Sequence, residues 1–82
     1  MNKKANWLVE KLEIEGEYIL RLYFADGSVG LFDFEPYLNE KLYSGLKDFK
    51  KFSKAKVVGG SVAWGDGIDI APEELYEKSI RK

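Results

Sequence analysis

Residues 22–34 read LYFADGSVGLFDF and form the most informative stretch of this sequence. An Asp-Gly pair between two strand patterns is the strongest local signal for a β-hairpin, because both central residues of a type I′ turn need a positive φ. We therefore predict antiparallel strands over residues 18–24 and 29–34, joined by a type I′ turn centred on Asp26 and Gly27.

The chain before this hairpin predicts one more strand. Residues 7–15 alternate apolar and charged side chains, and a turn at residues 15–17 leads back into the hairpin. The result is an antiparallel three-stranded meander. Pro36 follows it and ends the sheet, because proline fixes φ and has no amide hydrogen to donate to a ladder.

The second half of the chain predicts short helices and a second, smaller sheet. Residues 37–55 repeat apolar side chains every three or four positions, which indicates two short helices separated at Ser44-Gly45. Gly59-Gly60 is a tight turn between two short strands. After an extended piece at residues 68–70, a final helix over 72–80 starts at Pro72. This order of elements predicts the α+β class.

Composition excludes several classes of protein. The chain has 82 residues, which is one domain, a net charge of −1 and 15% aromatic residues. It contains neither Cys nor His, so a disulfide framework, a thiolate metal site and a Ser–His catalytic pair are excluded. No stretch resembles a secretory signal or a membrane span, and we expect a cytoplasmic protein.

Acidic residues cluster at the start of the final helix. Asp66, Asp69 and Glu73 could bind a hard cation through oxygen ligands, although their spacing does not match a calcium-binding loop. In the structural alternative, Asp66 stabilises a turn and Asp69 accepts amide hydrogens just upstream of the helix. Glu73 then interacts with the positive end of the helix dipole. We favour the structural alternative and predict no metal and no cofactor.

Lysines dominate the middle of the chain. Between Lys41 and Lys56 there are six Lys and one acid, Asp48, which leaves a local charge of +5. On a helix, Phe49 would point inward and the solvent side would carry the lysines Lys47, Lys50, Lys51 and Lys54. This side is either a solvated helix face, or a surface for an acidic protein or for nucleic acid phosphates.

Apolar residues on the second face of the meander are a third candidate. They are covered by the helices, or they form a surface for a protein partner or a second copy. The residues of this set are Trp7, Val9, Ile19, Tyr23, Phe32 and Phe34.

Three segments together resemble the bacterial family catalogued as domain of unknown function 2442. They are residues 22–34, residues 46–52 and residues 64–76. The resemblance spans nearly the whole chain and implies a small α+β domain without established catalytic residues. Longer relatives carry a helix-turn-helix domain after this module, and we expect no room for one here. Family members are often encoded beside a second small protein, which suggests a toxin–antitoxin pair.

The signature residues of this resemblance have structural explanations in the predicted fold. We expect Trp64 to anchor the second hairpin, Gly67 to allow a turn, and the final helix to pack back through Leu75 and Tyr76. The full signature set is Asp26, Gly27, Trp64, Gly67, Asp69, Pro72, Leu75 and Tyr76.

These observations predict a non-enzymatic protein-interaction module, either a homodimer or the antitoxin-like member of a pair. The expected interaction residues are Ile19, Tyr23 and Phe32 together with the four lysines. Two alternatives remain open: a nucleic-acid-associated regulator that uses the lysines, and a small carboxylate- or metal-dependent enzyme.

Overall fold

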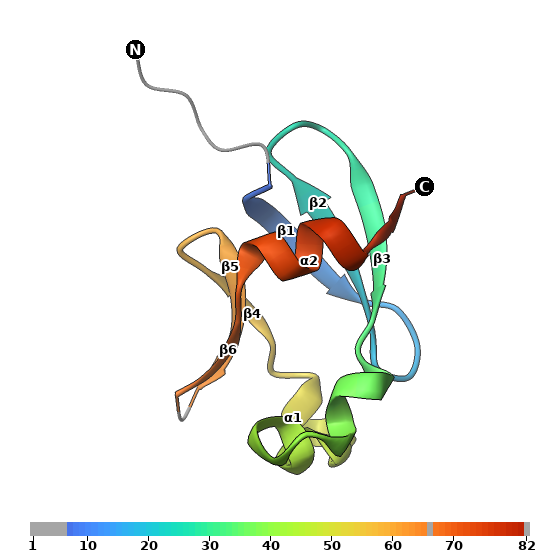
Figure 1. Ribbon diagram of the computed structural model, residues 1–82, viewed down its shortest axis with the longest axis vertical. Helices are drawn as coiled ribbons and strands as arrows, with labels where there is room; N and C mark the ends of the chain where they lie inside the picture. The colour runs from blue at the N-terminus through green and yellow to red at the C-terminus, as the bar shows by residue number, and fades with distance from the viewer. Residues whose placement is uncertain (1–6, 66, 82) are drawn as a thin grey trace.

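The computed structural model describes residues 7–65 and 67–81. It confirms the α+β class, with two small sheets and several short helices (Figure 1). In chain order the elements are β1 (Val9–Ile14), β2 (Ile19–Phe24), β3 (Val29–Asp33), the 3₁₀ helices η1 (Glu35–Asn39) and η2 (Lys41–Lys47), α1 (Phe49–Phe52), β4 (Lys56–Val58), β5 (Ser61–Gly65), β6 (Ile68–Ile70), α2 (Pro72–Lys78) and β7 (Ile80–Arg81).

The predicted meander gains a fourth strand from the end of the chain. The first sheet has the antiparallel order β1-β2-β3-β7, and the second has the order β4-β5-β6. The expected helix over 72–80 ends earlier, because Ser79 adopts an extended conformation with ψ of 146°. Ile80 therefore pairs with Leu31 as a strand residue instead of packing beneath a helix.

The first hairpin turn differs from the type I′ turn that we predicted. Tyr23 pairs with Val29, and the amide of Phe24 donates to the carbonyl of Ser28 at 2.9 Å, which leaves a three-residue loop. In that loop only Gly27 has a positive φ, of 89°. Such a loop needs one left-handed residue rather than two. At the second hairpin both Gly59 and Gly60 have positive φ, as a two-residue turn requires.

A bulge in β1 changes which side chains face the core. Val9 pairs with Phe24 but Lys11 pairs with Tyr23, so an extra residue lies between them. A bulge reverses the alternation of side chains. Val9 is therefore buried on the same side as Leu12, which a regular strand would not allow.

The helical segment is tighter than a regular α-helix. Its two breaks lie at Glu40 and Asp48, which adopt extended conformations, and not at Ser44-Gly45, which lies inside η2. The Asp48 carboxylate accepts a hydrogen bond from the Lys50 amide at 3.0 Å and so starts α1. Within η2 the buried Tyr43 and Leu46 are three residues apart, which matches the three residues per turn of a 3₁₀ helix.

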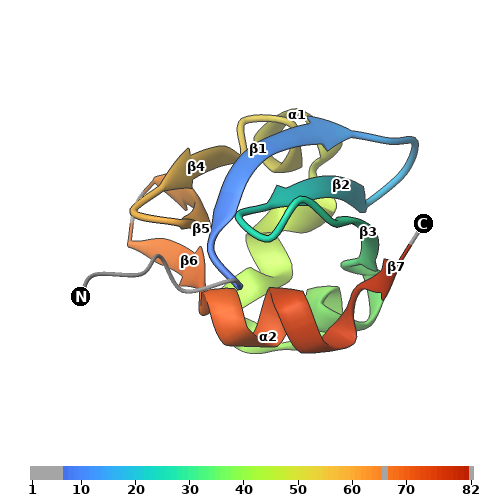
Figure 2. The same cartoon turned by 90° about the horizontal axis from the view of Figure 1, so that it is seen from above.

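Aromatic rings from distant segments meet at the centre of the molecule. Phe34 is fully buried and its ring lies 5.0–5.7 Å from four others, which belong to Tyr37, Tyr43, Phe52 and Trp64. These contacts join the end of β3 to the helical segment and the second sheet. Figure 2 shows α2 along one side of the first sheet, where Leu75 reaches the same core.

Tyr18 lies just before β2 rather than inside it. Its φ of 59° is unusual for a residue with a side chain. Its ring packs edge-on against Phe49 and Phe52, and its hydroxyl donates to the carbonyl of Lys47. These contacts hold the β1–β2 turn against α1 and offset the backbone strain.

Candidate interaction surfaces

The signature residues Asp26 and Tyr76, fifty positions apart, are in direct contact. The Tyr76 hydroxyl donates to the Asp26 carboxylate at 2.7 Å, and the same carboxylate accepts from the hydroxyl and the amide of Ser28. These bonds, first those from Ser28, lower the pKa of Asp26 to about 2. Arg81 lies over the rings of Tyr76 and Phe24, with its guanidinium carbon 4.2 Å and 4.9 Å from their centres. The contact thus joins α2 and β7 to the first hairpin.

The other signature residues also have positions that support the fold. The indole of Trp64 donates to the carbonyl of Phe52 at 2.9 Å and so joins β5 to α1. Pro72 occupies the first turn of α2, and Leu75 is fully buried. Asp69 does not cap α2, whose N-cap is Ala71 without a side-chain contact; its backbone carbonyl instead accepts from Tyr43 at 2.9 Å. Gly67 has a φ of 77° in the turn before β6.

The predicted carboxylate set extends beyond what the structure describes. Asp66 lies outside the described residues, and Asp69 and Glu73 both lie at the surface. Within residues 7–65 and 67–81, no three acidic side chains come close enough together to hold a metal ion. In the same ranges no helix has the length and apolarity that a membrane span requires.

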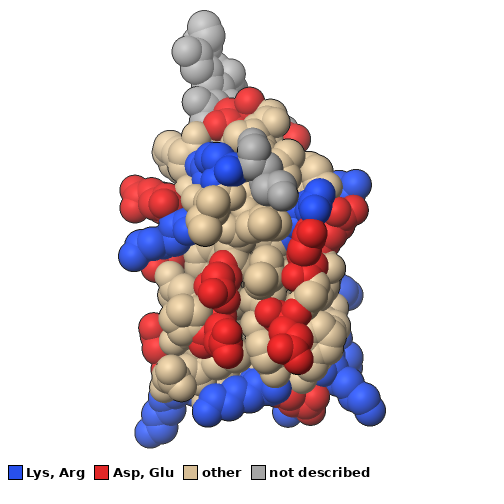
Figure 3. Space-filling view, turned by 90° about the vertical axis from the view of Figure 1, so that its right-hand side faces the viewer, with Lys and Arg blue, Asp and Glu red and all other residues tan. Residues whose placement is uncertain are grey.

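The lysines lie at one end of the molecule. Lys47, Lys50, Lys51 and Lys54 are all exposed, and we call them the lysine face. Figure 3 shows basic side chains along the lower edge of the molecule, the end where Figure 1 places α1. Phe49 is 41% exposed among these lysines, whereas the helical pattern predicted that it would point inward. Phe49 is the first residue of α1, and its ring packs against those of Tyr18 and Phe52 at the edge of the core rather than inside it.

The outer face of the first sheet carries none of the described helices, whereas α2 covers the opposite side (Figure 2). Five apolar residues point to this face and are partly or largely exposed. They are Ile19, Tyr23, Val29, Leu31 and Ile80, and we call them the sheet face. Phe32 does not belong to it. Phe32 pairs with Leu20 and is 1% exposed, so its expected role in an exposed surface is wrong. Val9 is buried because of the bulge in β1, and Phe34 is buried because it lies two residues after Phe32 and so points to the same side.

The two halves of this face differ in polarity. On the β1–β2 half, Arg21 binds both carboxylate oxygens of Glu15, and the hydroxyl of Tyr23 donates to Glu13 at 2.9 Å. On the β3–β7 half the side chains of Val29, Leu31 and Ile80 are aliphatic, with Asp33 at the end of the strand, and Ile80 is 72% exposed opposite Leu31. The β3–β7 half is therefore the part with apolar surface left to bury.

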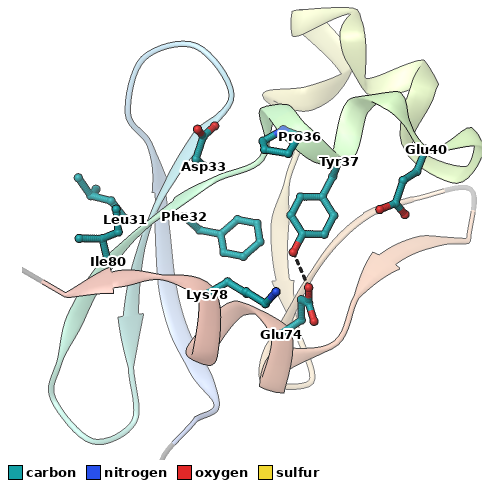
Figure 4. Close-up of a pocket in the computed structure, with 9 residues that line it drawn as sticks. All are labelled: Leu31, Phe32, Asp33, Pro36, Tyr37, Glu40, Glu74, Lys78 and Ile80. Atoms are coloured by element: carbon teal, nitrogen blue, oxygen red, sulfur yellow. Dashed lines mark hydrogen bonds between the residues drawn. The ribbon is translucent and has the colours of Figure 1, made fainter.

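A groove of about 440 Å³ opens beside that half. It is lined by Leu31, Phe32, Asp33, Pro36, Tyr37, Glu40, Glu74, Lys78 and Ile80. Figure 4 shows Leu31 and Ile80 at one end, the rings of Phe32 and Tyr37 in the middle, and Glu40 at the other end. The groove thus changes from aliphatic to aromatic to acidic along its length.

Two tyrosines lie at the acidic end, Tyr37 in the groove itself and Tyr43 in an adjoining hollow. The hydroxyl of Tyr37 donates to the Glu74 carboxylate. Burial, and then that hydrogen bond and the charge of Glu74, raise the pKa of Tyr37 above its ordinary range. Burial also raises the pKa of Tyr43, and the charges of Glu40, Asp69 and Glu74 raise it further. Both phenols therefore remain neutral at physiological pH, while the carboxylates around them give this end a negative potential.

The sequence contained no local signal for the groove. Its lining comes from β3, η1, α2 and β7, which span residues 31 to 80. Ile80 lies beside Leu31 only because it belongs to β7, and we had predicted a helix rather than a strand at this position.

One family model matches the chain. It carries the description "Protein of unknown function (DUF2442)" and covers residues 9–81. No curated protein and no solved structure matches the chain.

Proposed function

Since the chain belongs to the DUF2442 family, whose description names no activity, we propose from the surfaces alone that it is a non-catalytic, cytoplasmic protein-interaction module. Its partner is a second copy of the chain or a different small protein, as in an antitoxin-like pair. The sheet face is the binding surface.

The exposed β3–β7 half of the sheet face supports this proposal most directly. Ile80 is 72% exposed, and it stands in register with Leu31 on a face that no described helix covers. Removing an isoleucine side chain of this exposure from water would contribute about 1–2 kcal/mol to binding. The neighbouring Ile19 and Tyr23 extend the same face, and an aromatic side chain with a polar tip is common in protein interfaces.

A pair of matched substitutions tests this proposal. Ile80→Asp places a charge in the sheet face, and Val58→Asp places one at a similarly exposed position, 59%, on β4 of the other sheet. We expect wild type and Val58→Asp to dimerise, or to bind the protein encoded beside them, and Ile80→Asp to lose this association. Light scattering after size-exclusion chromatography measures the first, and co-purification of the two expressed proteins measures the second.

Two results would overturn the proposal. One is a monomer at high concentration that binds no neighbouring gene product. The other is association that survives Ile80→Asp unchanged while the variant remains folded by circular dichroism.

The exposed Phe49 favours a second candidate function, the binding of single-stranded nucleic acid. The segment that carries the four exposed lysines also carries a ring that is 41% exposed, and single-strand binding surfaces combine cationic side chains with aromatic rings on which bases stack. The expected result is binding of an oligonucleotide that weakens as salt rises, and a further loss with Phe49→Ala. Fluorescence anisotropy that detects no salt-sensitive binding would exclude it.

A further inference from the structure

We propose that the groove is a docking site for an extended segment of a partner protein, and that it binds a Lys or Arg side chain of that segment at its acidic end. This inference rests on the proposed interaction function and specifies the chemistry of the partner. Three features support it: the open edge of β3, the composition of the groove and its charge.

The edge of β3 is open where the groove runs. In the β2–β3 ladder the even-numbered residues of β3 bond to β2, as the bond from the Phe34 amide to the Tyr18 carbonyl shows. The odd-numbered residues therefore direct their backbone groups to the other side. There β7 pairs with β3 only as far as Leu31, so within the described residues no strand lies opposite Asp33. An added segment can continue the ladder at this position.

The groove follows this open edge. Leu31 and Phe32 point to opposite faces of β3, and yet both line the groove. A hollow lined from both faces of one strand must run along the edge of that strand. A segment bound at the edge would place one side chain near Leu31 and Ile80, and the next side chain, which points to the opposite face, near Tyr37 and the acidic end.

The charge of the groove specifies the second side chain. Three carboxylates line it, those of Asp33, Glu40 and Glu74, against one ammonium, that of Lys78. Glu40 and Glu74 also line an adjoining hollow of about 280 Å³. An aliphatic stem followed by a cation fits a groove in which the rings of Phe32 and Tyr37 precede the carboxylates of Glu74 and Glu40 (Figure 4). Lys and Arg are the two side chains with this build.

Defined peptides test the proposal without the natural partner. The probe is the acetylated and amidated pentapeptide Thr-Val-Arg-Val-Thr, and the control peptide carries citrulline, the neutral analogue of arginine. In two-dimensional NMR of the labelled protein, we expect the arginine peptide to shift the amides of Leu31, Asp33 and Tyr37 and to bind about tenfold more tightly than the control peptide, which corresponds to one good charged contact.

Matched protein variants assign the effect to the groove. The double variant Glu40→Gln/Glu74→Gln should lose about tenfold in affinity, and the side-chain amide oxygen introduced by Glu74→Gln would still accept the bond from Tyr37. Glu73→Gln removes the same charge from a residue of α2 that does not line the groove, and should change little. Lys78→Gln should strengthen binding, because it removes a competing cation.

Each outcome has a definite consequence. Equal binding of the citrulline peptide, shifts confined to other surfaces, or equal losses from Glu73→Gln and the double variant would overturn the proposal. If the peptides do not bind but association still depends on Ile80, the groove proposal fails and the interaction function stands. If the peptides bind in the groove but Ile80→Asp does not disturb association, the interaction surface proposed above is wrong.

Discussion

The lysine face and the groove share one helical segment but are assembled in different ways. The lysine face comes from a single stretch, residues 47–54, whose side chains project from η2, α1 and the turn after it. The groove needs β3, η1, α2 and β7 together. One surface therefore depends on local conformation, and the other depends on how α2 and β7 pack against the first sheet.

This difference has a physical consequence for stability. A local surface remains as long as the segment stays anchored at a few points, here by the contacts of Phe52 and the bond from Trp64. A surface built from several elements disappears when any one of them shifts out of place. The groove should therefore respond to substitutions that leave the lysine face unchanged.

The largest effect is expected from Phe34→Ala, which removes the ring between the two regions. Phe34 is fully buried and contacts five other rings. We expect a loss of about 3–5 kcal/mol of stability, much of what a small domain has. Urea unfolding followed by fluorescence measures it.

The control for this change is Phe49→Ala, a substitution of the same kind at a ring that is 41% exposed. Its cost should be much smaller. Equal costs at the two positions would mean that Phe34 is not the centre of the core.

Gly30→Ala should disturb the groove and leave the lysine face unchanged. A Cβ on Gly30 would lie 2.7 Å from the Cβ of Ser79 and 3.3 Å from the ring of Phe24, so the junction of α2 and β7 must move. Overpacking of this kind costs about 1–3 kcal/mol. In NMR spectra we expect the amides of Leu31, Tyr37 and Ile80 to shift, while those of residues 47–54 stay in place. Shifts of equal size in both regions would contradict the separation.

Trp64→Phe is the reciprocal change and should act on the lysine face. It removes the indole bond to the carbonyl of Phe52 and part of the ring that packs on Phe34 and Phe52. We expect a loss of about 1–2 kcal/mol and faster amide hydrogen exchange in α1, with the groove little changed. Exchange that increases first in α2 would contradict this assignment.

The same contrast explains what sequence analysis could reach. Strands β1 to β6, the helical segment and the lysines follow from short-range patterns and were predicted within a few residues, whereas β7 and the breaks in the helical segment were not. The burial of Phe32 and Val9 depended on strand register and a bulge, which alternation alone does not determine. The groove depended on β7, and two residues at the end of a chain carry too little pattern to distinguish a strand from the last turn of a helix. The lysines of a single segment are thus predictable, whereas the exposure of Phe49 and the formation of the groove depend on tertiary packing and are not.

The smallest effect concerns the attachment of α2 to the first hairpin and appears only in acid. The pKa of Asp26 is about 2 in the folded protein, below its ordinary value of 3.8, so the carboxylate stabilises the fold above that ordinary value and loses this contribution as the pH falls through about 2. Asp26→Asn removes the titration, although its amide oxygen still accepts from Ser28. Urea unfolding between pH 5 and about 2 should show wild type losing its advantage over the variant across this window.

The same titration should reach the groove but not the lysine face. Because Tyr76 donates to the Asp26 carboxylate from α2, the amides of the groove should shift over the same pH range, and those of residues 47–54 should not. A variant whose stability parallels that of wild type at every pH would show that the contact between Asp26 and Tyr76 does not hold α2 in place, and that the groove depends on Leu75 and β7 instead.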